Sequence, residues 1–313
     1  FPDSKIHAKA SLSDPQTALK PTFHVELSSN VKTAVSQQGA GMVRAAAFGM
    51  LRFRQKWLSK REDDHRRSLI ICFEEPEIYL HPSAANQMRD SIYDLSGIES
   101  QIVATTHSPF IIDLSRKPKQ ILNSLRYNAG ELSSMPFNIT KAYLDLQEDD
   151  KAHVKMLQRI DDHLARVFFT KHVVIVEGDT EEIVIKESLK RLSKEKYLNI
   201  VSNFEIIKAR GKASIIGLTK YLIAMNISPT IVHDRDAGTA GAVVFNQPIA
   251  DALGGAGKVI QMHENIEDEL GYAAPSAEKP FRAYQKTKEW GDTWLDIPEK
   301  WRARMESIFD GYI

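Results

Sequence analysis

Acidic residues follow two apolar segments in the second half of the chain. Glu177 and Glu181 lie in VVIVEGDTEE, and Asp234 and Asp236 lie in TIVHDRDAG. A strand ending at Glu177, a tight turn at Gly178 and a helix just after it would bring the first two carboxylates to one spot. Side chains two positions apart on a strand leave the same face, so Asp234 and Asp236 are expected together beside the first pair.

Four carboxylates in a small volume repel one another, and divalent cations neutralise them. Oxygen ligands favour Mg²⁺ or Mn²⁺ over Zn²⁺, because no cluster of Cys or His accompanies these acids. His233 and His263 stand alone nearby and are interpreted as structural or surface residues. The pattern therefore predicts a hard-metal site, and a plain acidic loop is the alternative.

A fifth acidic ligand is expected downstream, in HENIEDELGY. Glu267 is the favoured residue, with Asn265 on the same side of an extended segment. Lys279, in AEKPFRAYQK, would offset charge on a phosphate in the transition state. The surplus of acids leaves other assignments open, namely Glu264, Asp268 and Glu269.

A second group of candidate residues occurs in the first half. Glu74 and Glu75 follow the apolar run LIICF, at the strand end where nucleotides bind in parallel α/β sheets. One acid would orient magnesium and its neighbour would activate water. His107 ends the next strand, in position to sense a terminal phosphate, and Gly39 and Gly41 open a helix whose N–H groups would meet phosphate oxygens.

The elements that must position these residues alternate between helix and strand. In the first half the pattern predicts a helix over 42–60, a strand at LIICF, a helix over 83–96 and a strand at QIVATT, with 117–147 irregular or extended. A helical stretch, 149–169, leads to a boundary near residue 168. In the second half HVVIV, FEIIKA, PTIVH and GKVIQ alternate with helical stretches, so the fold class is α/β with a central parallel sheet flanked by helices.

Composition is that of a globular protein: of 313 residues 42% are hydrophobic and 26% charged, with 41 basic and 41 acidic side chains. We expect two domains, 1–167 and 168–313, in a cytoplasmic protein without a membrane span. The single cysteine, Cys72, is expected to fill a buried strand. Two local basic clusters, each also readable as a solvated helix face, are Arg52, Arg54, Lys56, Lys60, Arg61, Arg66 and Arg67, and Lys279, Arg282, Lys286 and Lys288.

The order of the motifs resembles the OLD (overcoming lysogenization defect) family. Glu-Gly-x-Thr-Glu and Asp-x-Asp at two strand ends are the pattern of a Toprim domain, and the EEPE, LHP and THSP motifs before it resemble the C-terminal part of an ABC-type ATPase domain. By this resemblance Glu177, Glu181, Asp234, Asp236 and Glu267 hold two Mg²⁺ or Mn²⁺ ions, and Lys279 is the catalytic lysine. Gly39 and Gly41 then belong to the signature loop, Glu74 and Glu75 to Walker B, and His107 is the switch histidine.

The phosphate loop that such an ATPase needs does not occur in these residues. No GxxxxGK[ST] pattern is present, and ARGKAS and GGAGKV lack its spacing. We therefore expect an incomplete ATP site and an N-terminal portion outside this chain. Since a signature loop serves the nucleotide of the partner subunit, the resemblance implies a homodimer through the ATPase domain.

The resemblance implies an ATP-regulated, metal-dependent DNA endonuclease in antiphage defence or DNA repair, which in some relatives acts with a helicase-like protein. Two alternatives stay open. One is a non-catalytic DNA-binding or scaffolding module whose acids hold a structural ion. The other is a topoisomerase- or primase-type Toprim enzyme, although strand passage needs a tyrosine partner domain that the sequence does not show.

Overall fold

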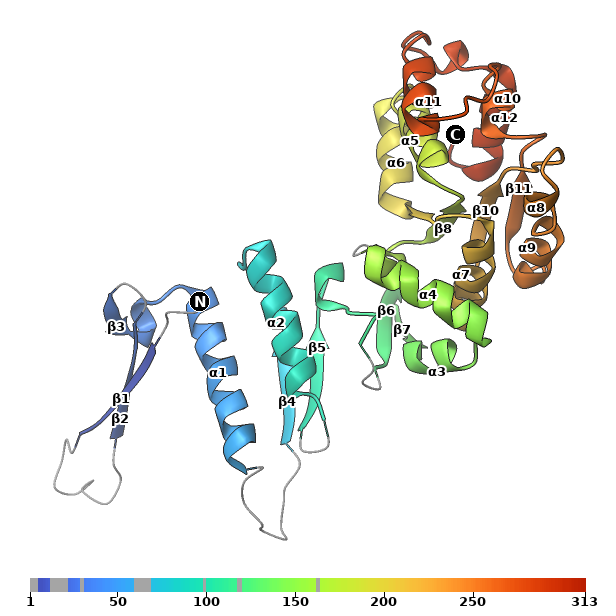
Figure 1. Ribbon diagram of the computed structural model, residues 1–313. Coiled ribbons are helices and arrows are strands. Elements are labelled where there is room, and N and C mark those ends of the chain that lie inside the picture. The colour runs from blue at the N-terminus through green and yellow to red at the C-terminus, as the bar shows by residue number, and fades with distance from the viewer. Residues whose placement is uncertain are drawn as a thin grey trace. The chain divides into compact units, whose positions relative to one another are not determined.

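The computed structural model describes residues 5–11, 22–28, 31–58, 69–97, 100–116, 120–161 and 164–313. The chain divides into two compact units, Phe1–Pro118 and Lys119–Ile313 (Figure 1). Both contain parallel strands joined through helices, so the predicted α/β class is confirmed. The domain boundary expected at 167/168 stays a prediction. The division at 118/119 reflects contacts within the chain, and a boundary between two evolutionary domains can lie elsewhere.

Unit 1 begins with an antiparallel sheet, β1 (Lys5–Ser11), β2 (Thr22–Ser28) and β3 (Lys32–Ala34). Helix α1 (Ala40–Leu58) leads toward the parallel pair β4 (Leu69–Glu74) and β5 (Ser100–Thr105), which α2 (Pro82–Leu95) connects. A short 3-10 turn, η3 (Pro109–Ile111), follows β5. These elements match the predicted helices and strands to within two residues at each end; residues 59–68, with the basic positions Lys60, Arg61, Arg66 and Arg67, lie outside the described residues.

The core of unit 1 lies on one face of the β4–β5 pair. Phe48 of α1 stacks on Phe73 with ring centroids 4.5 Å apart, and residues of α2 complete the cluster. The other face of the pair presents Ile70, Cys72 and Val103, all exposed. The expectation that Cys72 fills a buried strand is therefore wrong: strand residues alternate between faces, and Cys72 points away from the core.

Unit 2 begins with a regular hairpin, β6 (Leu122–Asn128) and β7 (Glu131–Phe137), whose turn residues Ala129 and Gly130 both have positive φ. Helices α3 (Ile139–Leu144) and α4 (Glu148–Ile160) follow, then a 3-10 segment, η4 (Leu164–Phe169). The segment 117–147 was expected to be irregular or extended; in its described part the two strands are extended but form a regular hairpin, and α3 is helical. Polar strand residues hid the hairpin, since its exposed positions lack a clean apolar alternation.

A four-stranded parallel sheet forms the centre of unit 2, in the order β11-β10-β8-β9. Its strands are β8 (His172–Val176), β9 (Phe204–Lys208), β10 (Pro229–His233) and β11 (Lys258–Gln261). Val173, Val174, Ile175 and Val176 are each at most 2% exposed, because both faces of the sheet are covered. All four strands point the same way, so their carboxyl ends share one edge.

Helices cover the two faces of this sheet (Figure 1). On one face α5 (Asp179–Leu189), α11 (Lys279–Thr287) and α12 (Glu299–Ile308) enclose a core that includes Val174, Val176 and Trp301. On the other α7 (Lys212–Ala224) packs on α4, α9 (Asn246–Leu253) and β10. The remaining elements are α6 (Lys194–Asn203), α8 (Ala240–Val243), α10 (Ile266–Glu269) and η5 (Trp294–Asp296).

Candidate metal centre

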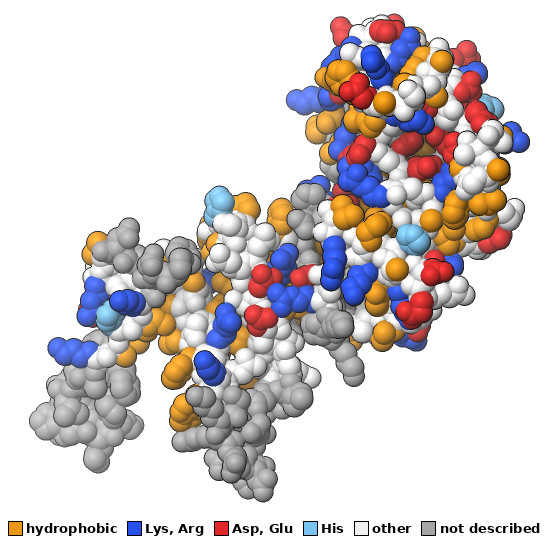
Figure 2. Space-filling model, viewed as in Figure 1, with side chains coloured by type: hydrophobic (Ala, Val, Ile, Leu, Met, Phe, Trp, Pro, Cys, Tyr) orange, Lys and Arg blue, Asp and Glu red, His pale blue; other side chains and the backbone are white. Residues whose placement is uncertain are grey.

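The carboxyl edge of the sheet in unit 2 carries a pocket of about 310 Å³. Glu177 follows β8, Glu181 lies in the first turn of α5, Asp234 follows β10 and Glu267 lies in α10; all four line the pocket, together with Lys279 at the start of α11. Figure 2 shows acidic side chains gathered in a hollow on the visible face of unit 2. The structure thus brings together residues that are far apart in the sequence.

Three carboxylates form the tightest part of this cluster. Glu177, Asp234 and Asp236 each offer an oxygen, and these oxygens all lie within 4.8 Å of one another. Asp236 has a left-handed backbone, φ +51°, and its N–H donates to the Glu264 carbonyl at 3.0 Å. A residue other than glycine adopts this conformation at a cost, so the loop after β10 holds Asp236 at the cluster against local strain.

Several carboxylate oxygens in the pocket are buried without a hydrogen-bond partner among the described residues. They are Glu177 Oε2, Asp234 Oδ1 and both oxygens of Glu267. Asp234 is 8% exposed and Glu267 only 1%. Buried carboxylates without partners are costly, so these oxygens fit a cation ligand better than a purely structural role.

The electrostatics of the pocket reflect this crowding. Burial, and next the negative charge of Glu181, raise the pKa of Glu177 to about 7. Burial, and next the charges of Glu181 and Glu177, raise the pKa of Asp234 to about 8. Burial also raises the pKa of Glu181, although its Oε2 accepts a 2.8 Å hydrogen bond from Gly178 N–H. A divalent cation would offset both causes, because its charge stabilises the ionised carboxylates in the buried site and screens their repulsion.

The donor set fits a hard divalent cation. All of the clustered ligands are carboxylate oxygens, as Mg²⁺ and Mn²⁺ prefer, and neither histidine joins them. His233 is 1% exposed and its Nδ1 lies 2.8 Å from the Asp234 carbonyl oxygen. His263 contacts the Glu269 carboxylate at 2.9 Å.

Two lysines approach the acids. Lys279, half exposed, places Nζ 3.9 Å from Glu267 Oε1. Lys212, whose side chain is 3% exposed, places Nζ 2.7 Å from Asp236 Oδ2. Sequence reasoning missed Lys212, because it considered ARGKAS only as a failed phosphate loop. The signal was its place: the lysine begins the helix after β9, and in the chain β9 comes between the two strands that end in acids.

The other acidic residues of HENIEDELGY are engaged elsewhere. Glu264 Oε1 accepts from Gly238 N–H at 3.1 Å, and Glu269 pairs with Arg304 at 3.1 Å. Asp268 lies 3.7 Å from Lys300. Asn265 caps α10, with Oδ1 accepting from Asp268 N–H at 2.9 Å. The expected extended segment is therefore wrong: 266–269 are helical, and the cap occupies the Asn265 side-chain oxygen.

The nucleotide-binding candidates lie in unit 1. Gly39 directly precedes α1, Gly41 lies in its first turn, and Glu74 ends β4. Glu75, with φ +42°, accepts from His107 N–H at 3.2 Å and lies 3.5 Å from His107 Nε2. Glu77, next along the EEPE motif, accepts a hydrogen bond from the Thr106 hydroxyl. The structure thus joins the second acid to the histidine across the β4–β5 edge, and their roles toward a nucleotide stay predictions.

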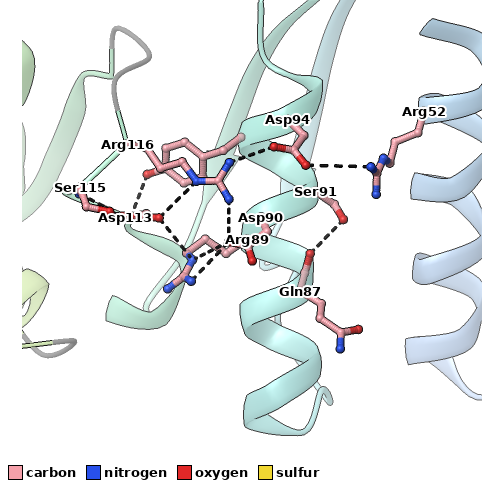
Figure 3. A network of polar contacts seen from close by, with 10 residues as sticks. Arg52, Gln87, Arg89, Asp90, Ser91, Asp94, Asp113, Ser115 and Arg116 are labelled. Atoms are coloured by element: carbon pink, nitrogen blue, oxygen red, sulfur yellow. Dashed lines mark hydrogen bonds and ion pairs between the residues drawn. The ribbon is translucent and has the colours of Figure 1, made fainter. Parts of the chain in front are cut away.

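An ion-pair network joins α2 to the segment that follows His107 (Figure 3). Arg116 contacts Asp94 at 2.9 Å, Asp90 at 3.1 Å and Asp113 at 3.4 Å. Arg116 also lies over the Tyr93 ring, 5.9 Å from its centroid. The network fastens the chain after the candidate switch histidine to α2.

Comparisons with known proteins agree with this geometry. A family model described as an AAA ATPase domain matches residues 4–112, and one described as the overcoming lysogenization defect protein-like TOPRIM domain matches residues 168–236. In this order, the two matches are those expected of a chain that is similar to the OLD family. The Toprim match contains Glu177, Glu181, Asp234 and Asp236, whereas Glu267 and Lys279 lie beyond it.

Relatives in this family carry nuclease names. Old nuclease of Escherichia phage P2 is 24% identical over 202 residues, which cover 64% of this chain and 33% of that protein. OLD nuclease of Thermus scotoductus is 24% identical over 265 residues, 76% of this chain and 47% of that protein. Endonuclease GajA of Bacillus cereus is 26% identical over 133 residues, 37% of this chain and 19% of that protein. The chain thus spans less than half the length of each of these relatives.

Among the described residues, no helix is both long enough and apolar enough to span a membrane.

Proposed function

We propose that unit 2 carries the cutting centre of an ATP-regulated, divalent-metal-dependent DNA endonuclease. The observation that carries the proposal is the buried, unpartnered oxygens of Glu177, Asp234 and Glu267 at one sheet edge. Nuclease names among the relatives support the same activity. Glu177, Glu181, Asp234, Asp236 and Glu267 would hold two Mg²⁺ or Mn²⁺ ions.

Bound cations of this kind activate water and stabilise the leaving oxygen in phosphodiester hydrolysis. The residues of the chain supply the rest. The carboxylates fix the position of the cations, and the covered sheet faces keep the ligands rigid. Lys279 is half exposed at the pocket, so its ammonium group can reach a phosphate oxygen of DNA and offset the charge that develops there.

Unit 1 would supply the ATP dependence. We propose that five residues of unit 1 contact a nucleotide: Gly39, Gly41, Glu74, Glu75 and His107. A complete site would also need a phosphate loop. We propose that ATP brings two copies together around DNA and controls cutting without taking part in it. A helicase-like partner in antiphage defence, a role in DNA repair and a cytoplasmic location belong to the same proposal.

Tyrosine-based strand passage is the enzymatic alternative. Tyr272 is not an activated nucleophile, because burial, and next the charge of Glu267, raise the pKa of its phenol to about 12. Covalent protein–DNA adducts in the assay below would favour the topoisomerase-type alternative.

The test is nicking of supercoiled plasmid by the purified chain with Mg²⁺, Mn²⁺, Ca²⁺ or a chelator, with and without ATP. We expect cleavage only with Mg²⁺ or Mn²⁺, and none by Glu177→Ala or Asp234→Ala. The exposed α9 variant Asp251→Asn is the matched control and should cut normally. Undiminished nicking by both alanine variants would remove the proposal, and DNA binding without cleavage under every condition would favour the non-catalytic alternative.

A further inference from the structure

Lys212 is a buried cation inside the acidic cluster. Its Nζ lies 2.7 Å from Asp236 Oδ2, and its side chain is 3% exposed. Lys212 Nζ also donates a hydrogen bond to Asn246 Oδ1 at 3.1 Å, which holds the ammonium group in place. A charge this deeply buried must be paired, so the contact with Asp236 is a buried ion pair of the acidic cluster and not a surface ion pair.

The backbone around Lys212 aims the side chain at the acids. Arg210 and Gly211 both have left-handed φ values, +63° and +117°, and Gly211 N–H donates to the Glu177 carbonyl at 3.0 Å. This bond ties the start of α7 to the end of β8. The first residue of α7 is Lys212, which therefore begins its helix at the edge where the carboxylates gather.

Asn246 closes the arrangement from the other side. Its Nδ2 donates to the Arg235 carbonyl at 2.8 Å, within the Asp234–Asp236 segment. The loop that carries both aspartates is thus held by contacts among Lys212, Asn246 and the Arg235 carbonyl. These contacts keep Asp236 at the cluster, and Lys212 occupies one of the two carboxylate oxygens of Asp236.

We propose that Lys212 is a built-in counter-cation, which neutralises Asp236 in the metal-free pocket and competes with an incoming divalent ion for that carboxylate. The inference rests on the proposed metal site. It assigns the ligands unequal roles: Glu177, Asp234 and Glu267 keep oxygens open for an ion, whereas Asp236 shares its carboxylate with the lysine and offers both oxygens only when the lysine gives it up. Without Lys212 the pocket would have one more uncompensated negative charge.

The proposal predicts the sign of a charge deletion. Lys212→Met removes the competitor and strengthens the negative field, so Mn²⁺ should bind at least about fivefold more tightly to the metal-free chain. Free Mn²⁺ is measured by electron paramagnetic resonance in the absence of DNA, a readout independent of cleavage. Lys212→Arg, which keeps the charge, should bind Mn²⁺ within about twofold of wild type.

The matched control is Lys220→Met. Lys220 lies on the same helix and pairs with Asp150 at the same 2.7 Å, but Asp150 is not one of the three clustered carboxylates, whereas the partner of Lys212, Asp236, is. Its loss should leave Mn²⁺ affinity unchanged. An affinity of Lys212→Met equal to or weaker than that of wild type would overturn the inference, while the proposed metal site would still stand if wild type binds Mn²⁺.

A double variant keeps the test decisive if Lys212→Met does not fold. Lys212→Met with Asp236→Asn removes both members of the pair and leaves no stranded charge. Because Asp236 is already occupied in the wild type, the double variant should bind Mn²⁺ within about threefold of wild type. A loss of tenfold or more would show that Asp236 ligates the ion despite Lys212, and would refute the competition; no Mn²⁺ binding by wild type would overturn both the inference and the metal site.

Discussion

Oxygens of Glu177 and Asp234 lie within 4.8 Å of each other, although the two residues follow different strands. Strands β8 and β10 are parallel neighbours, with Val176 opposite Val232, so the residues just beyond them emerge side by side. The register brings the two strand ends together, and the course of the backbone just beyond them completes the approach of the two carboxylates. Their mutual repulsion and the oxygens they leave unpartnered make the pocket unfavourable without a cation, and the predictions below follow from that conflict.

Stability of the metal-free chain should fall as pH rises. The pKa of Glu177 is raised from 4.5 to about 7 and that of Asp234 from 3.8 to about 8. The folded state therefore binds these protons more tightly than the unfolded state. The resulting stabilisation is fully present below about pH 4 and is lost as pH rises through about 7 to 8.

Thermal unfolding in chelator at pH 5 to 9 checks this prediction. The difference in Tm between wild type and Asp234→Asn isolates the aspartate from other titrating groups. As pH increases, the Tm of wild type should fall relative to that of the variant. Saturating Mn²⁺ should reverse the trend, since metal binding requires deprotonated ligands. A difference that is flat across this range would contradict the raised pKa values.

Replacing the buried aspartate should stabilise the metal-free fold and destroy the site. Asp234→Asn removes a negative charge from a position 8% exposed, beside Glu177 and Glu181. At pH 8 in chelator we expect a gain of roughly 1–3 kcal/mol in unfolding free energy, because a buried negative charge beside two other carboxylates is removed. Denaturant titration measures it, with Asp251→Asn as a surface control that should change little; a loss of stability would mean that Asp234 is well accommodated without metal.

Lys279 should matter for cutting and not for holding ions. Its side chain is half exposed, and its Nζ lies 3.9 Å from Glu267 Oε1, a distance too long for a hydrogen bond. Lys279→Ala should lower plasmid cleavage by about 100- to 1000-fold, as for loss of one transition-state donor. Mn²⁺ affinity should change little by comparison.

The control is Arg282→Ala, one turn along α11, where an exposed cation pairs only loosely with Glu278 at 3.9 Å. Its cleavage should remain within a few-fold of wild type. Equal losses in the two variants would mean that the basic face of α11 acts through general attraction to DNA, without a specific role for Lys279.

Arg116 should stabilise the end of unit 1. It contacts three aspartates, including Asp94 at 2.9 Å and Asp113 at 3.4 Å (Figure 3). Arg116→Ala would leave the three aspartates with the weaker contacts to Arg89 and Arg52, and about 1–2 kcal/mol of local stability should be lost for a partly exposed network. Hydrogen exchange of α2 measures this loss. Arg52→Ala, which removes only a 3.9 Å contact to Asp94, should change it much less.

Local sequence signals were sufficient for most of the fold. The buried parallel strands are short runs of β-branched and other apolar residues, and Glu177, Asp234 and Glu75 were found because acids directly after such strands lie at the ligand-binding edge. Exposure was harder to foresee. Cys72 has an apolar sequence context on both sides, yet its face of β4 is open, and HENIEDELGY gives no periodicity that separates a helix turn from an extended ligand segment.

The sequence by itself determined the α/β class, the family resemblance and which acids stand at strand ends, because these depend on residue types and short spacings. Only the tertiary structure decided that Glu267 joins Glu177 and Asp234 while Glu269 turns to Arg304, and that Lys212 pairs with Asp236. The reason is physical. Strand order, register and backbone turns at positive φ set which side chains come into contact. The charges interact strongly only when they are removed from water, which happens once both faces of the sheet are covered.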